Sequence, residues 1–274
     1  KVAGVLSPLI LGAIVLKNAD VIKEQLGKLT NIIERESLLQ EMASRVIFPY
    51  VIMAVVLILL AVLVRLSPLP DIDTDKDDAQ LAENTTKKTN ILQFPHLLLG
   101  SLAIFFCVGA EVISGDTIIL YGQSQGIIME KARIFTSYTL ASMVIGYILG
   151  IILIPKYLKQ EKALAVSASL GLLFSLVAIY TSGFTSVVFI ALLGFANAVM
   201  WPAIWPLAIT GLGRFTKIGS ALLIMGILGG AVLPLLYGRL VDIDTIGSQQ
   251  AYWILIPCYL YIFYYAVKGS RIKY

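Results

Sequence analysis

Charged residues are scarce in this sequence, at 14% of the chain, and the only histidine is His96. Soluble domains average about 25% charged residues, so this balance excludes a soluble enzyme. The two cysteines, Cys107 and Cys258, both lie inside apolar stretches and are too few for a disulfide framework or a cysteine-rich zinc site. A single histidine also excludes the His-Glu-x-x-His motif of zinc proteases. We therefore expect no catalytic residues, no metal and no cofactor.

Long apolar runs are what the sequence has instead. Apolar residues make up 58% of the 274 residues, and they recur in uninterrupted runs of about 20, the length of helix that crosses the roughly 30 Å hydrocarbon core of a membrane. The sequence therefore predicts an all-α integral membrane protein. The eight predicted spans are residues 2–16, 46–66, 95–121, 133–155, 163–181, 184–209, 217–240 and 249–267.

The basic residues predict the orientation of these spans. An even number of crossings places both chain ends on one side, and that side holds 13 of the 21 lysines and arginines, against 8 on the other. Because short cytoplasmic loops carry the excess of Lys and Arg, we predict that both ends are cytoplasmic. The same distribution explains the formal net charge of +4 without a nucleic-acid partner.

Two polar stretches interrupt the spans. Residues 67–94 separate two predicted spans from six, which indicates a cytoplasmic linker. Residues 17–45 carry leucines and isoleucines at near-helical spacing among charged residues, which predicts a short amphipathic helix at the membrane surface. The chain is thus expected to divide into residues 1–66, the linker at 67–94 and a six-helix unit at 95–274.

One predicted span carries carboxylates at depth. Glu111 lies about 14 residues past Leu97, roughly 21 Å into the membrane at about 1.5 Å per residue, whereas Asp116 lies nearer the outer end. A charge in the bilayer core costs roughly 2.5–3.5 kcal/mol, so Glu111 is a functional candidate. Five residues, or about 140° of helix, separate the two carboxylates, which argues against one dyad. Glu111 either carries a proton in each cycle or only hydrogen-bonds to a neighbouring helix or a ligand.

A second span combines an amide, indoles and prolines. Asn197, Trp201 and Trp205 fall at four-residue intervals, which places them on one helical stripe. An amide reads sugar hydroxyls and an indole packs on the apolar face of a pyranose, so the stripe predicts a sugar site. Pro202 and Pro206 each remove a backbone hydrogen bond, as is tolerated beside a cavity. The next span is dense in glycine at 219–230, which suggests a helix that slides or rocks against another.

These residues resemble a known family. Residues 201–208, Trp-Pro-Ala-Ile-Trp-Pro-Leu-Ala, and the glycine-rich stretch 211–235 are similar to the sugar:cation symporters related to the L-fucose permease, within the major facilitator superfamily. Residues 94–96 and 108–111 are similar to its bacterial glucose/galactose branch. The resemblance covers essentially the whole chain and is most specific over 199–241. Cys107 departs from it, because an aromatic residue is expected there.

The resemblance implies a transporter of twelve helices in two six-helix bundles. This chain would hold the last two helices of the first bundle and the whole second bundle, and about four N-terminal helices would be its missing partners. The acidic residues most associated with proton coupling would lie in that missing half. Glu111 would then serve sugar binding more than coupling, with Asp116 a further coupling candidate. The helices expected to line the cavity add Tyr121 and Tyr138 to the site.

The sequence thus predicts a secondary transporter that imports a hexose, such as glucose, galactose or fucose, together with a cation. Its partners are a sugar, the lipid bilayer and a coupling ion, with a proton favoured over sodium. The predicted location is the bacterial inner membrane. Two alternatives stay open on sequence grounds: a major facilitator exporter of hydrophobic compounds, and a sugar sensor on the same fold that does not transport.

Overall fold

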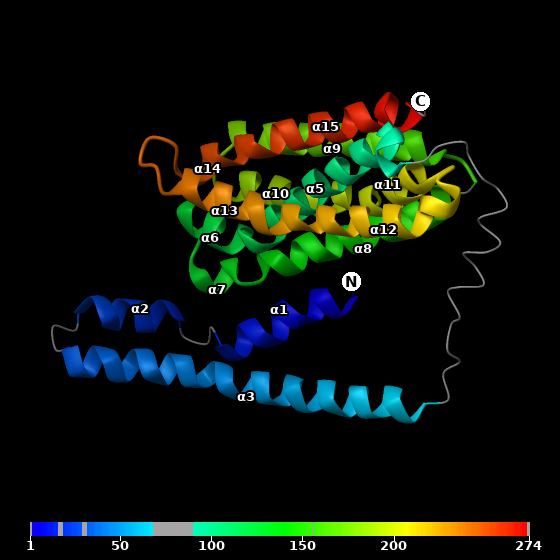
Figure 1. Ribbon diagram of the computed structural model, residues 1–274. Helices are drawn as coiled ribbons and strands as arrows, with labels where there is room; N and C mark the ends of the chain where they lie inside the picture. Colours follow the sequence, from blue (N-terminus) through cyan, green and yellow to red (C-terminus); the bar gives the residue numbers. More distant parts are fainter. Residues whose placement is uncertain (1, 16–18, 29–31, 68–89, 155, 273–274) are drawn as a thin grey trace.

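The computed structural model describes residues 2–15, 19–28, 32–67, 90–154 and 156–272 (Figure 1). Over this part of the chain every regular element is a helix, as the apolar runs predict. Seven helical segments in it are long and apolar enough to cross a membrane. The all-α multi-pass membrane architecture is therefore confirmed, with one predicted span fewer than the sequence suggested.

The missing candidate is the first predicted span. Helix α1 covers Val2–Val15, and its 14 residues extend only about 21 Å, less than the hydrocarbon thickness of a bilayer. It lies between α3 and the main bundle in Figure 1 and contacts the bundle through Ser137, whose hydroxyl donates to the carbonyl of Val5 at 3.0 Å. The last residue of the predicted span, residue 16, lies outside the described residues.

The predicted surface helix within residues 17–45 is wrong in its extent. The structure divides this stretch between α2, Ala19–Lys28, and the first part of α3, Ile32–Leu66, which continues directly into the predicted span 46–66. Residues 32–45 are rich in Glu, Gln, Leu and Arg, which favour a helix, and they contain no glycine or proline that would end it. The polar and apolar parts therefore form one helix of 35 residues.

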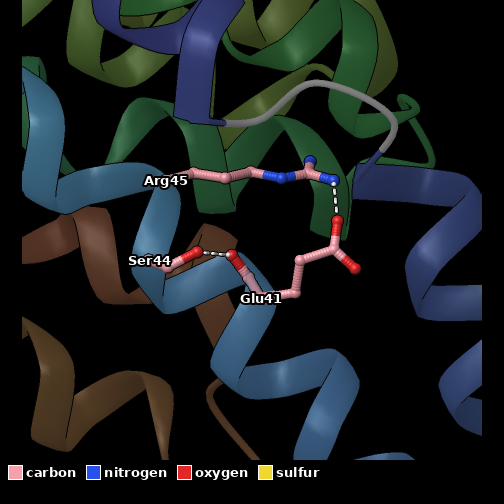
Figure 2. Close-up of polar contacts among 3 residues, drawn as sticks. All are labelled: Glu41, Ser44 and Arg45. Atoms are coloured by element: carbon pink, nitrogen blue, oxygen red, sulfur yellow. Dashed lines mark hydrogen bonds and ion pairs between the residues drawn. The ribbon is translucent and has the colours of Figure 1, made fainter.

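Local contacts support the polar part of α3. Figure 2 shows Arg45 donating from Nη2 to Oε1 of Glu41 at 3.0 Å, one helical turn away. The hydroxyl of Ser44 donates to the backbone carbonyl of Glu41 at 2.7 Å. Exposed pairs of this kind contribute only a few tenths of a kcal/mol each. They fix the helix locally and do not tie it to the bundle.

The remaining helices form one bundle of six membrane-spanning segments, several of which are built from two or more helical pieces. They are, in order, Pro95–Asp116 (α5) with Ile118–Ser124 (α6); Met129–Ala132 (α7) with Phe135–Leu153 (α8); Gln160–Tyr180 (α9); Gly183–Asn197 (α10) with Met200–Ile209 (α11); Thr216–Met225 (α12), the 3₁₀ turn Gly226–Leu228 (η3) and Gly229–Val241 (α13); and Gly247–Gln250 (α14), Ala251–Ile254 (η4) and Leu255–Val267 (α15). Short 3₁₀ turns at Ile91–Gln93 (η1), Gly213–Phe215 (η2) and Gly269–Arg271 (η5) complete the described elements.

Helix α5 lies at the centre of this bundle. It packs along α13, α11, α15 and α10, and α10 in turn packs on α8 and α9. The main cluster of buried apolar residues runs from Phe94 to Ala266. Each candidate site residue therefore lies on an element that touches α5 or belongs to it.

Candidate functional site

The centre of the candidate site is a hydrogen-bonded network around Asn197, at the end of α10. Tyr259 of α15 donates its hydroxyl to Oδ1 of Asn197 at 3.0 Å. The Nδ2 of Asn197 donates to the hydroxyl of Ser114 on α5 at 3.4 Å, and that hydroxyl donates to the backbone carbonyl of Glu111 at 2.9 Å. The network joins three helices directly behind the candidate carboxylate.

The amide of Asn197 is thus placed in the core. The residue is 1% exposed, and its side chain holds protein partners at both ends. The sugar contact predicted for Asn197 stays a prediction. The observed geometry gives the amide a supporting position behind Glu111, because a buried polar side chain satisfied by the protein holds its neighbours in fixed positions.

Glu111 lies half-buried on α5, on a different face from Asp116. Asp116 ends the helix and is exposed, as are Leu98 and Leu102, which fall on the same face of α5 as Asp116. Ser114 lies about 60° from Glu111 around the helix axis, on the side that meets α10. The two carboxylates therefore point in different directions, as their spacing indicates.

The indole pair lies just beyond a break between α10 and α11, the two helices of one membrane segment. The α-helix α10 ends at Asn197 and α11 begins at Met200. Pro202 has no amide hydrogen, so the carbonyl of Ala198 has no helical donor there. Past the break, the rings of Trp201 and Trp205 stack with centroids 5.8 Å apart and planes 21° apart, both half-buried. Stacking four residues apart confirms that the two indoles share a stripe of α11.

The two candidate tyrosines occupy different environments. Tyr138 on α8 is exposed and lines a cavity of about 260 Å³ together with Phe135, Ser142 and Phe184. Tyr121 on α6 is buried, and its hydroxyl is hydrogen-bonded to the hydroxyl of Ser186 on α10. Its ring also meets that of Tyr252 edge-on, with centroids 4.8 Å apart. Tyr138 is open to a ligand in this structure, whereas Tyr121 packs in the core.

Helix α5 and the glycine-rich segment approach each other closely. A Cβ on Gly109 would lie 2.9 Å from the carbonyl oxygen of Gly229, and a Cβ on Gly226 would lie 2.7 Å from that of Ser101. A Cβ on Gly229 would collide with the backbone of Phe105. Only glycine allows this approach, and the 3₁₀ turn η3 interrupts the segment at the same level. A 3₁₀ turn within a helical segment is typical of a hinge.

Residues that sequence reasoning did not single out complete the network. Tyr259 and Ser114 are two of several tyrosines and serines inside apolar runs, and no spacing in the sequence distinguishes them from the others.

His96, at the start of α5, is buried, with its Nε2 3.0 Å from the carbonyl oxygen of Thr210. Within the described ranges no group of three or more His, Cys, Asp or Glu side chains is placed to hold a metal ion.

Residues 122–126 read Gly-x-Ser-x-Gly, the pattern of a serine-hydrolase nucleophile. That nucleophile requires a strand before the serine and a helix after it. Here Ser124 is the last residue of the helix α6, so a helix and not a strand leads into it. Its hydroxyl donates to the carbonyl of Tyr121 at 2.8 Å. The segment therefore ends a helix and does not form a catalytic elbow.

Known proteins similar to this chain are sugar transporters. The glucose/galactose transporter of Brucella abortus biovar 1 is 32% identical over 232 residues, which cover 84% of this chain and 55% of the relative. The L-fucose-proton symporter of Escherichia coli K12 is 26% identical over 229 residues, covering 81% of this chain and 51% of the relative. The chain spans about half the length of the curated relatives it matches.

A solved structure gives the same fold. The crystal structure of the major facilitator superfamily transporter FucP in the outward conformation matches with a TM-score of 0.66 and 24% identity, over 91% of this chain and 60% of that one. No protein-family model matches the sequence. The resemblance to sugar symporters and the major facilitator fold predicted from the sequence are both confirmed.

Proposed function

From the premise that this chain has a partial major facilitator fold and is a relative of bacterial sugar transporters, we propose that it is the C-terminal portion of a cation-coupled hexose importer. Residues 1–66 supply the last two helices of the first bundle, residues 67–94 the linker and residues 95–274 the second bundle. Upstream helices complete the central cavity, and the two bundles rock about a sugar held between them.

The observation that carries this proposal is the position of Glu111. Its carboxylate is half-buried inside an apolar bundle, on a helix fixed by the network through Ser114, Asn197 and Tyr259. An ionisable side chain within a membrane segment is uncommon and marks a candidate functional site. A carboxylate accepts hydrogen bonds from sugar hydroxyls, which suits a hexose better than a hydrophobic solute.

The other site residues have complementary roles. The stacked indoles Trp201 and Trp205 offer an apolar surface to the sugar ring, and the exposed Tyr138 adds a phenol. Asn197 and Tyr121 position α5 and α10 from the core or reach the sugar in another conformation. Asp116 is a further candidate for coupling. The coupling ion is a proton, a choice supported by the L-fucose-proton symporter among the relatives.

The membrane is the inner membrane of a bacterium, and both chain ends face the cytoplasm if the predicted span 2–16 is counted as a crossing beside the seven longer helical segments. The excess of Lys and Arg in alternate loops supports this orientation. In the proposed mechanism, import and cation coupling are one process, because a cation that moves down its gradient into the cell drives the sugar inwards.

The test is uptake of labelled hexose by proteoliposomes that carry the complete transporter to which this chain belongs. A proton gradient, a sodium gradient or neither is imposed, and unlabelled glucose, galactose and fucose compete. Accumulation only under the proton gradient, with competition by one of the three sugars, is expected. Hexose binding without flux would identify a sensor instead, and neither binding nor flux would favour an exporter of hydrophobic compounds.

A further inference from the structure

An apolar groove lies between α8 and α9, with α10 as its floor. The cavity in it has a volume of about 130 Å³. It is lined from α8 by Leu149 and Leu153, from α9 by Val166 and Leu170, and from the α10–α11 segment by Phe195 and Val199. Among the residues that line this cavity, Ser167 alone has a polar side chain, and it is buried, so the groove suits an apolar occupant.

A second cavity of about 300 Å³ adjoins the first. The two share Gly150, Ile154 and Val199, so together they form one continuous depression. The second cavity is also lined by Tyr147 and Gln160, which bring polar groups to it. The depression is thus apolar over its length, with a phenol and a carboxamide at one part of its wall.

Glycines on α8 create the depth. A Cβ on Gly146 would lie 2.9 Å from the carbonyl oxygen of Phe195, and a Cβ on Gly150 would collide with the side chain of Val199. At these two positions α8 lies against α10 without side chains of its own, and the space between the neighbouring rims stays open. The rims themselves are exposed and apolar, with Leu149 on one side and Val166 on the other.

Lysines gather at the end of the groove. Lys156 and Lys159 in the connection between α8 and α9 and Lys162 in the first turn of α9 fall within seven residues, and all three are exposed. The nearby carboxylate of Glu161 is paired with Arg271 at 2.9 Å, so its charge is directed to another partner. The groove therefore ends beside a cluster of positive charge.

We propose that this groove is a binding site for an anionic phospholipid. An acyl chain lies in the depression over Gly146 and Gly150, and the phosphate of the headgroup lies among Lys156, Lys159 and Lys162. Basic clusters beside grooves between membrane helices are suited to acidic headgroups, because the lysines neutralise the phosphate while the chain stays in apolar surroundings. The combination favours a lipid over a second protein helix, since a helix would not bring an anion to the lysines.

The site does not depend on the proposed sugar transport. It lies on α8, α9 and the α10–α11 segment, away from Glu111 and the network behind it, and a lipid bound there would hold α8 against α9. Its test therefore measures lipid and not sugar.

The experiment uses the complete 274-residue chain, purified from nanodiscs of equal parts phosphatidylglycerol and phosphatidylcholine into mild detergent. Native mass spectrometry then counts the lipids that stay bound. The unaltered chain is expected to retain phosphatidylglycerol at least threefold over phosphatidylcholine. The triple variant Lys156→Gln, Lys159→Gln, Lys162→Gln should lose that preference. Val166→Trp, which fills the groove from its rim, should lose the bound lipid.

Matched variants isolate the site. Leu173→Trp adds the same side chain seven residues further along the same face of α9, where the exposure of 53% is close to the 51% of Val166, but outside the groove. The triple variant Lys131→Gln, Arg239→Gln, Lys268→Gln removes the same charge elsewhere. Both should retain phosphatidylglycerol as the unaltered chain does. Leu149→Trp fills the groove from the opposite rim if Val166→Trp does not fold, as judged by circular dichroism.

The proposal is overturned by any of three results. Equal retention of the two lipids by the unaltered chain would remove the anionic specificity. Unchanged retention in the folded groove-filling variant would place the lipid elsewhere. Displacement of the lipid by millimolar inorganic phosphate would show that the lysines bind a free anion and that the groove contributes nothing.

Discussion

At the scale of single residues, the bundle is organised by a few buried polar side chains. Within the described residues, the clearest case is the series Tyr259, Asn197, Ser114 and Glu111, because two of its hydrogen bonds cross between helices and the third ends at the backbone carbonyl of Glu111. In an apolar interior such bonds are strong, and a missing partner is costly. The network therefore fixes where Glu111 lies.

Replacing Tyr259 by Phe tests this fixing. The change leaves Oδ1 of Asn197 buried without its donor, which is expected to lower the free energy of unfolding by about 1–3 kcal/mol. Tyr261→Phe is the control, because the hydroxyl of Tyr261 donates to the carbonyl of Leu99, which lies inside helix α5 and keeps its helical donor. Thermal unfolding in detergent measures both. Equal stability of the two variants would contradict the role given to the network.

Replacing Glu111 by Gln tests the candidate site itself. The amide keeps the shape and removes the negative charge, so hexose affinity in the complete transporter is expected to fall at least tenfold, about 1.4 kcal/mol. Trp201→Ala should weaken affinity as well, because the sugar loses a stacking surface. Asp242→Asn, an exposed carboxylate at the end of α13, is the control and should bind normally. Isothermal titration with hexose is the measurement, and normal binding by Glu111→Gln would make this carboxylate structural.

At the scale of helices, the contact between α5 and α13 depends on the absence of side chains. Gly229 lies against the backbone of Phe105, and Gly109 packs on Leu233, so the two helices cannot separate without losing both contacts. The 3₁₀ turn η3 lies directly before this contact. The helix that the sequence predicts to slide or rock is therefore the segment from α12 to α13, and η3, beside the close glycine contact, is its candidate hinge.

Gly229→Ala tests the contact. Its Cβ would collide with the carbonyl of Phe105, so the two helices must separate and the variant is expected to lose about 1–3 kcal/mol of stability. Gly238→Ala is the matched control on the same helix, because its Cβ would meet nothing within 4 Å and alanine is the better helix former by up to about 1 kcal/mol. Thermal melts of the two variants should shift in opposite directions. A destabilised Gly238→Ala with a normal Gly229→Ala would refute the assignment.

At the scale of the whole molecule, the six-helix bundle is packed and α3 is not. The buried apolar cluster runs from Phe94 to Ala266, whereas the side chains of α3 from Tyr50 onward are exposed. In Figure 1 the ribbon of α3 runs apart from the bundle. An apolar helix of this length is stable in a bilayer without neighbours, but it forms no cavity wall by itself. Within the described residues one six-helix bundle is packed, and the proposed rocking mechanism needs a second.

The 274-residue chain alone is expected not to accumulate hexose in proteoliposomes under a proton gradient, because the proposed function requires upstream helices to complete the cavity. It should nevertheless insert and resist protease over residues 95–272, where the bundle is packed. The complete transporter in parallel vesicles serves as the positive control. Robust accumulation by the chain alone would show that one bundle and α3 suffice.

The sequence by itself determined the membrane architecture, because a run of about 20 apolar residues has one low-energy conformation in a bilayer, a helix with its own backbone groups satisfied. It also determined the divergence of Glu111 and Asp116 and the stacking of Trp201 and Trp205, since helical periodicity fixes both. What extends along one helix was therefore predictable.

Only the tertiary structure decided what happens between helices. The amide of Asn197, which the pattern placed on an open stripe, is held by Tyr259 and Ser114 from two other helices, and nothing in the spacing reports on those partners. The groove beside Lys156 likewise depends on packing, because its lining comes from α8, α9 and the end of α10. Apolar side chains look alike in a sequence, and which of them meet is settled by shape complementarity across the bundle.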